Sequence, residues 1–320
     1  MHVFETFRGR TRLRLRATPG DLAFEGLSTF IALAVVGLLV LITVILYLAA
    51  AESIRTYGLG FLSGSVWDSV SQRFGAAPFI YGMLVTSALA LLLGVPVSLG
   101  IAIFLSELSP AWLRIPLTFI VELLAAVPSV VYGLWGIFIL GPAMRVYIEP
   151  GVQAVLGFLP LFQGHPIGSD VFTAGVILAI MIIPTISALS REALLAVPDS
   201  QREAALSLGA TRWETTRLGV LRYARAGIFG AAILGLGRAV GETMAVTMTI
   251  GNRAAFFGSL FEPGQTIASQ IASRWLDAVP PLELGALIQL GLVLMLVSLF
   301  INLFARLMVG RFLRVGEGAE

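Results

Sequence analysis

Two charged residues lie inside one of the most apolar stretches of the sequence. Arg238 and Glu242 are four residues apart, so in a helix they would share one face, one turn from each other. We expect them to form an ion pair. An arginine at mid-membrane costs about 2.5 to 3.5 kcal/mol on insertion scales, so it needs a partner or a function. Its planar guanidinium is well suited to bind the oxygens of an oxyanion.

The pair has two explanations, and the residues alone leave both open. It either contributes to a path for an oxyanion or forms a structural ion pair that fixes helix packing. Gly237 and Gly241 flank the charges and would let another helix approach closely. The glycine spacing is not that of a nucleotide-binding fingerprint.

A second group of residues, between the fourth and fifth apolar runs, is polar and helix-forming. Ser200 and Glu203 have the spacing of a capping box, which predicts a helix start. Gly209 is suited to end that helix with a positive φ. Thr211 predicts the cap of a second helix, with Glu214 three residues later. The stretch is either a solvated helical hairpin or a docking element for another protein.

The composition requires a membrane environment for these residues. Of the 320 residues, 57% are hydrophobic and only 12% are charged, against about 25% charged in soluble domains. The apolar residues form runs long enough to cross a hydrocarbon core of about 30 Å. We therefore predict an all-α, polytopic transmembrane protein.

Two residue types are absent, and their absence limits the chemistry. There is no cysteine, which excludes disulfides and thiolate sites, and every one of the 21 basic residues is arginine. A phosphate-binding Walker A loop needs a lysine, so any ATP must be hydrolysed by a partner. His2 and His165 are far apart in the sequence. We therefore expect no metal centre, no cofactor and no catalytic residues.

The apolar runs predict a six-helix bundle whose termini lie on the same side of the membrane. The first run exceeds the 7 to 15 residues of a signal peptide core, so we expect a retained helix. We expect a basic tail over 1–26, a transmembrane domain over 27–308 with a loop at 191–225, and a second tail over 309–320. The predicted spans are 27–50, 79–105, 117–140, 171–189, 226–250 and 284–308.

The distribution of arginine predicts the orientation. Most arginines lie in the N-terminal tail, the turn at Arg114, the loop 191–225 and the C-terminal tail. The opposite loops hold five, namely Arg55, Arg73, Arg145, Arg253 and Arg274. Because cytoplasmic loops are enriched in arginine and lysine, we expect both termini and the loop 191–225 to be cytoplasmic.

The loop carries a motif of a known family. Glu203, Ala204, Ala205 and then Gly209 resemble the EAA-xxx-G loop of binding-protein-dependent ABC importer permeases. In that family the loop forms a coupling helix that docks in a cleft of the ATPase subunit. The family's Ile-x-Leu-Pro ending is absent, since the corresponding positions read Gly219-Val-Leu-Arg222. The resemblance therefore favours the docking element over the solvated hairpin.

Two further runs resemble one branch of that family, the C-type permease of phosphate-specific importers. They are GLGRAVGETMAVTMTIGN at Gly235–Asn252 and LLAAVPSVVYGLWG at Leu123–Gly136. The resemblance implies a type I importer permease (MetI-like) fold and a role for Arg238 and Glu242 in phosphate passage. It also implies a bacterial inner-membrane location and four kinds of partner: a sister A-type permease, two ATPase subunits, an extracytoplasmic phosphate-binding protein and membrane lipid, with no nucleic acid.

Pro128 lies inside the predicted third helix and is expected to kink it. Ser129 would satisfy a carbonyl freed by the kink. A sharper interpretation is that this segment, with Ser129, lines the translocation path.

The charged residues are compatible with other substrates and with other classes of protein. Sulfate and molybdate are alternative substrates, because one arginine does not distinguish oxyanions. A proton-coupled secondary anion transporter would use the same charges, but it would favour an inverted repeat that the sequence lacks and would need no docking loop. An intramembrane enzyme would need a nucleophile and base, for which the sequence offers no constellation.

Overall fold

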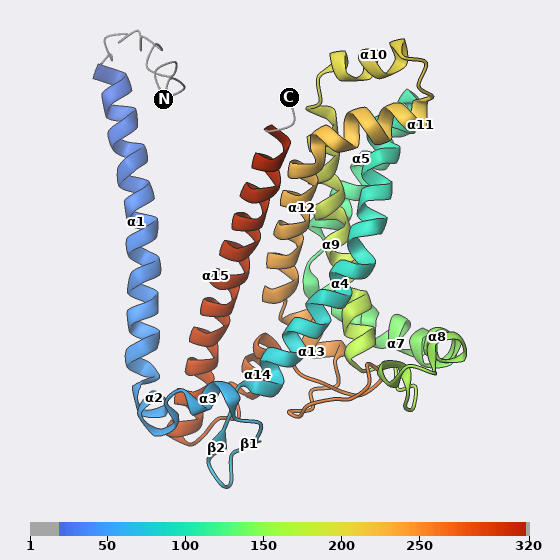
Figure 1. Cartoon of the computed structure of the whole chain (residues 1–320). Helices are drawn as coiled ribbons and strands as arrows, with labels where there is room; N and C mark the ends of the chain where they lie inside the picture. Colours follow the sequence, from blue (N-terminus) through green and yellow to red (C-terminus); the bar gives the residue numbers. More distant parts are fainter. Residues whose placement is uncertain (1–18, 318–320) are drawn as a thin grey trace. The chain divides into compact units, whose positions relative to one another are not determined.

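The structure is a computed structural model that describes residues 19–317, and most of these residues are helical (Figure 1). The chain divides into two compact units, 1–48 and 49–320. The first unit contains nearly all of α1, Pro19–Ala49. The arginines of the expected basic N-terminal tail fall in residues 1–18, outside the described part of the chain.

The second unit contains the remaining elements. Its long helices are α4 (Ala77–Ile103), α5 (Ala111–Ala126), α9 (Val171–Leu195), α12 (Leu221–Gly241) and α15 (Pro281–Glu317). Its short elements are α2 (Ala51–Tyr57), α3 (Gly60–Ser63), β1 (Trp67–Asp68), β2 (Arg73–Phe74), the π-helical turn η1 (Phe104–Leu108), α6 (Ser129–Trp135), η2 (Gly136–Leu140), α7 (Gly141–Ala143), η3 (Met144–Ile148), α8 (Glu149–Leu156), η4 (Pro160–Phe162), α10 (Asp199–Ser207), α11 (Arg212–Glu214), η5 (Thr215–Val220), α13 (Met244–Thr249) and α14 (Ile267–Arg274). The two strands pair antiparallel, with Trp67 opposite Phe74.

Within the described residues, six helices are long and apolar enough to cross a membrane, as predicted. The third and fifth differ from the prediction, since the third lies further along the chain than 117–140 and the fifth ends before 250. The six are Ala23–Ala49, Ala77–Leu108, Ser129–Leu156, Val171–Leu195, Arg212–Gly241 and Pro281–Leu307.

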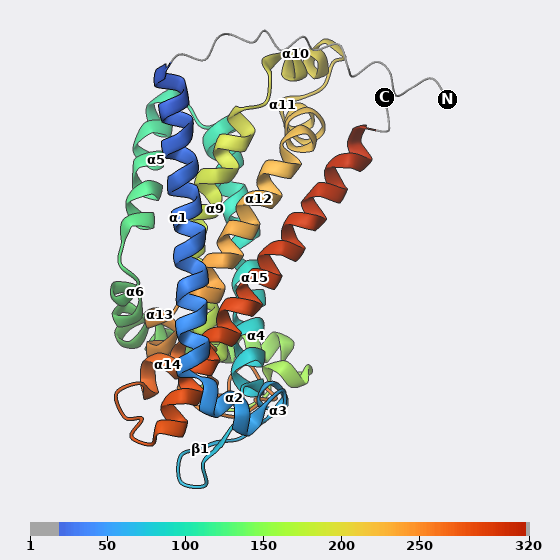
Figure 2. The same ribbon diagram turned by 90° about the vertical axis from the view of Figure 1, so that its left-hand side faces the viewer.

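Helix α9 forms the centre of the second unit, with α4 and α12 packed along it (Figure 2). Glycines shorten the distance between the helices: Gly94 of α4 faces Ile182, and Gly175 of α9 faces Leu89. Small residues at such contacts let helix backbones approach closely. The Asp170 carboxylate caps the first turn of α9, accepting a 2.8 Å hydrogen bond from the Thr173 amide. Helices α4 and α12 are therefore placed against a buried, capped α9.

The predicted third span, 117–140, is broken where a kink was predicted. Helix α5 ends at Ala126, and α6 begins at Ser129. Val127 and Pro128 between them have extended backbone, with ψ of 127° and 142°. Figure 2 shows this extended stretch between the two helices. Proline restrains the residue before it to extended conformations, so the helix stops here rather than bending.

The predicted fifth span, 226–250, is broken as well. Helix α12 ends at Gly241, and Glu242 is extended with ψ of 126°. The chain resumes as α13 at Met244, and α13 packs against α6. A side chain at Gly133 of α6 would meet Ala245 and Met248 of α13. The two breaks thus free two short helices to pack on each other.

Candidate functional site

Arg238 lies in the last turn of α12, half-buried against α9. Its Nη1 donates a 2.9 Å hydrogen bond to the Thr185 hydroxyl of α9. Among the described ion pairs none joins Arg238 to Glu242, so the predicted pairing is wrong. The reason is local: the helix ends at Gly241, and the one-turn spacing assumed for the pair does not exist. The Glu242 carboxylate instead accepts a 3.3 Å hydrogen bond from the Ala245 amide at the start of α13.

Ser129 is the first residue after one break, and Glu242 lies in the other break, two residues before α13. Gly133 of α6 faces Ala245 and Met248, whereas Gly136, three residues later, faces Thr249. The contacts therefore advance in the same direction along both helices. Ser129 and Glu242 lie at the same end of this helix pair. The structure thus brings these two predicted residues to one end of a helix pair, and Arg238 precedes the second break.

This arrangement leaves donors available for an anion. A guanidinium carries five N–H donors, and the described hydrogen bonds of Arg238 use one of them. The neighbouring acceptor is a neutral hydroxyl, which does not cancel the positive charge. A half-buried arginine without a carboxylate partner is suited to attract an oxyanion.

The predicted docking element lies at the end of the second unit where α12 begins (Figure 1). Helix α10 carries Glu203, Ala204 and Ala205, and the first two of these are exposed. Gly209 follows with φ of 83°, as predicted. The Ala210 amide donates to the Ala205 carbonyl (3.2 Å) and the Gly209 amide to the Leu206 carbonyl (2.9 Å). This is a Schellman motif, which ends α10 at a fixed angle.

Of the two predicted caps in this loop, one forms. Thr211 and Glu214 make a reciprocal capping box, with Thr211 N to Glu214 Oε2 at 2.8 Å. The box predicted from Ser200 and Glu203 is absent, because α10 begins at Asp199 with Pro198 in the cap position. Pro198 fixes the chain entering the helix, and Ser200 falls inside the first turn. Glu203 is therefore free of a capping role.

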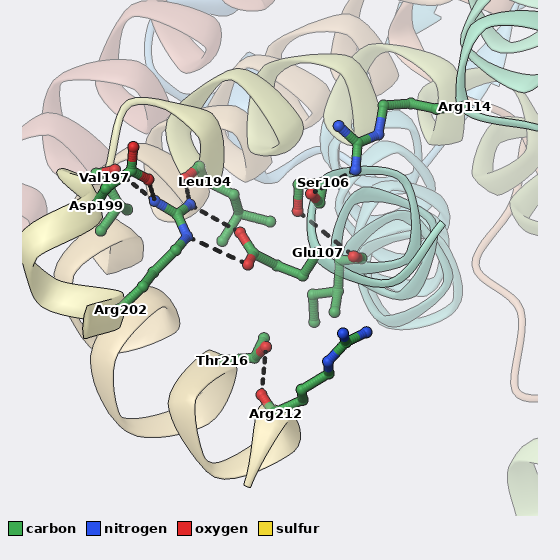
Figure 3. Close-up of polar contacts among 10 residues, drawn as sticks. Ser106, Glu107, Arg114, Leu194, Val197, Asp199, Arg202, Arg212 and Thr216 are labelled. Carbon is green, nitrogen blue, oxygen red and sulfur yellow. Dashed lines mark hydrogen bonds and ion pairs between the residues drawn. The ribbon is translucent and has the colours of Figure 1, made fainter. Parts of the chain in front are cut away.

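One residue of this loop makes contacts that the sequence did not indicate. Arg202 binds Glu107 with two hydrogen bonds, Nη2 to Oε1 at 2.9 Å and Nε to Oε2 at 3.3 Å (Figure 3). Glu107 belongs to η1, at the end of the second span. The partners are 95 residues apart, so no spacing rule joins them. In the sequence, the contact is suggested only by the position of both charges, which flank apolar runs at the same end of the bundle.

A bundle of membrane-spanning helices, with two broken helices near a half-buried arginine and an exposed polar helix at one end, has the architecture of an ABC importer permease. Solved structures share this fold. A bacterial alginate ABC transporter in complex with an alginate-bound periplasmic protein matches with a TM-score of 0.58 and 16% identity, over 92% of this chain and 97% of that one. An inward-facing MetNI methionine ABC transporter matches with a TM-score of 0.53 and 18% identity, over 72% of this chain and 93% of that one. The predicted MetI-like fold is confirmed.

The chain belongs to the family of binding-protein-dependent transport system inner membrane components, whose model matches residues 94–314. It is thus a multi-pass inner-membrane protein. It is similar to the phosphate transport system permease protein PstC of Haemophilus influenzae, with 43% identity over 89% of this chain and 92% of the relative. PstC of Xylella fastidiosa (strain Temecula1) is 42% identical over 94% of both chains. PstC 2 of Mycobacterium tuberculosis is 39% identical over 92% and 93%.

Proposed function

We propose that this chain is the permease subunit of an ABC importer that moves inorganic phosphate inward across the bacterial inner membrane. The names of its relatives support the substrate class. The observation that carries the proposal is Arg238, a half-buried guanidinium that binds a hydroxyl rather than a carboxylate. Such a group attracts an oxyanion without being neutralised beforehand.

Glu242 and Ser129 complete the proposed path. Both lie where a helix is interrupted, and interrupted helices near the middle of a membrane protein expose backbone groups to a cavity. The Ser129 hydroxyl is a donor for phosphate oxygens. The Glu242 carboxylate repels a bound anion, and this repulsion prevents Arg238 from holding the phosphate too tightly.

The exposed part of α10 is the proposed contact with an ATPase subunit. Glu203 offers a charge and Ala204 a small exposed surface, and the half-buried Ala205 lets η5 approach closely at Gly219. The turn at Gly209 holds α10 across the end of the bundle. Motion of the ATPase would then move α10 as a rigid body.

The complete importer in this proposal needs several further chains. A sister A-type permease pairs with this one, two ATPase subunits bind at the α10 end, and a phosphate-binding protein docks at the opposite end. With no lysine for a Walker A loop, this subunit has no ATPase site of its own. The arginine distribution supports a cytoplasmic location for both termini and for α10.

Uptake of labelled phosphate by the complete complex in proteoliposomes tests the proposal. We expect uptake that requires internal ATP and is not displaced by excess sulfate or molybdate. Uptake driven by a proton gradient without ATP would establish the secondary-transporter alternative instead. If excess sulfate instead abolished the uptake of labelled phosphate, another oxyanion would be the preferred substrate.

Two variants test the division of roles. Arg238→Gln should leave the complex assembled and reduce transport, whereas Glu203→Gln should weaken ATPase binding. Arg274→Gln, an exposed arginine of α14, is the matched control and should change neither. Equal loss of assembly in the Arg238 and Glu203 variants would contradict the assignment.

A further inference from the structure

Helix α10 is held to the bundle by little apolar surface. None of its residues is buried. Its neighbour η5 approaches through Gly219, where an added side chain would meet the Gln201 carbonyl at 3.2 Å. Leu206 and Leu208 at its far end are 51% and 89% exposed. Polar contacts must therefore hold the position of α10.

Arg202 provides those contacts. Its side chain is 20% exposed, and that of its ion-pair partner Glu107 is 12% exposed. Besides Glu107, the guanidinium donates to the Val197 carbonyl (2.7 Å), the Leu194 carbonyl (3.0 Å) and the Asp199 carboxylate (3.1 Å). One side chain thus joins α10 to the end of α9 and to η1 (Figure 3).

The contact continues from η1 to α5. Arg114, in the first turns of α5, donates to the carbonyls of Ser106 (3.4 Å) and Ser109 (3.3 Å) on either side of Glu107. At its other end α5 stops at the break that precedes Ser129. A continuous series of contacts therefore links α10, through Glu107 and α5, to the break between α5 and α6.

We propose that Arg202 is a positioning residue of the permease, and that its two-pronged ion pair with Glu107 transmits the displacement of α10 to α4 and α5. The inference rests on the proposed role of α10 as the contact with the ATPase. A planar guanidinium held by two parallel hydrogen bonds resists both rotation and translation of its partner. A lysine at this position would supply charge without that geometry.

The importer in proteoliposomes gives the functional test, with the ratio of phosphate transported to ATP hydrolysed as the readout. Arg202→Gln and Glu107→Gln should lower this ratio at least about fivefold, in the range of typical coupling energies. Arg202→Lys should be intermediate. Arg217→Gln, an exposed arginine in the same loop, should match the wild type. A wild-type ratio in the Arg202→Gln complex would overturn the proposal.

A charge exchange separates transmission from simple folding. Arg202→Glu alone should uncouple the complex, and the double variant Arg202→Glu with Glu107→Arg should recover part of the ratio. The double variant Arg202→Gln with Glu107→Gln is compared with the two single variants. If its loss of coupling equals the sum of the two single losses, the two residues do not act together and the proposal is wrong. This double-mutant comparison remains informative even if one variant assembles less well.

A structural measurement makes the result independent of the substrate. The chain contains no cysteine, so Ser207→Cys on α10 and Leu108→Cys on η1 allow two spin labels to be placed without other changes. The distance distribution should be narrow in the otherwise wild-type chain and broader with Arg202→Gln. An unchanged distribution would overturn the proposal. If phosphate uptake fails in the wild type while the distribution broadens as expected, the proposed function fails and the Arg202 contact stands.

Discussion

The Tyr132 hydroxyl donates a 2.9 Å hydrogen bond to the Leu124 carbonyl oxygen, across the two extended residues that separate α5 from α6. Leu124 is in the last turn of α5, and its carbonyl also accepts a 3.4 Å hydrogen bond from the Val127 amide. The Tyr132 side chain, 8% exposed, therefore joins α6 to α5 across the break.

Tyr132→Phe should destabilise the protein, because it removes this hydrogen bond and leaves the ring in place. We expect a loss of about 0.5 to 1.5 kcal/mol, measured as a lower midpoint of thermal unfolding in detergent. Tyr147→Phe is the control, since that side chain is 75% exposed. Equal midpoints for the two variants would show that the bond does not stabilise the break.

Gly209→Ala should strain the turn after α10. The residue has φ of 83°, and an added Cβ would meet nothing within 4 Å, so the effect isolates backbone conformation from packing. A left-handed residue with a Cβ costs about 1 to 2 kcal/mol. We expect weaker ATPase binding in a pull-down from detergent.

Two comparisons check the Gly209 prediction. Gly209→Asn should be milder, because asparagine tolerates this conformation better. Gly230→Ala, in α12 and equally open, should have no cost. Binding that is unaffected by Gly209→Ala would mean that the angle of the turn does not matter for docking.

Features set by neighbouring residues could be predicted from the sequence. The apolar runs correctly predicted six spans, Gly209 predicted the turn after α10, and Thr211 with Glu214 predicted the capping box of α11. Each depends on contacts within a few residues, and the residue types alone determine them.

Features set by packing between distant segments could not be predicted. The sequence permits a helix through Glu242, and the break there accompanies the contact of α13 with Gly133. The expected Arg238–Glu242 pair assumed an intact helix and therefore failed. Arg202 and Glu107 meet only because the ends of α4 and α9 are adjacent in the fold.

Asp170 should make the stability depend on pH. Burial raises the pKa of this carboxyl above its usual value. The folded state thus favours the neutral form. The associated stability is present below the unfolded pKa of about 3.9 and is lost as the pH rises through the higher folded pKa. We expect the midpoint of thermal unfolding to fall over that interval.

Asp170→Asn should flatten this dependence, because asparagine stays neutral and still caps the first turn of α9. Asp68 gives a control of opposite sign. Its hydrogen bond from Ser71 lowers its pKa, so Asp68→Asn should remove stability that is present above the unfolded pKa and lost in acid. Parallel pH profiles for the wild type and Asp170→Asn would contradict the prediction.

Two glycines of α4 should respond to alanine in opposite directions. A Cβ at Gly82 would collide with the backbone carbonyl of Gln265, which is held in place by the capping box of Thr266 and Ser269 at the start of α14. A backbone atom cannot move aside as a side chain can, so we expect a cost of about 1 to 3 kcal/mol. At Gly100 nothing lies within 4 Å, and alanine is the better helix former by about 0.8 to 1 kcal/mol. The midpoint of thermal unfolding should therefore be lower than that of the wild type for Gly82→Ala and higher for Gly100→Ala. A Gly82→Ala variant as stable as the wild type would mean that α4 and α14 are further apart than described.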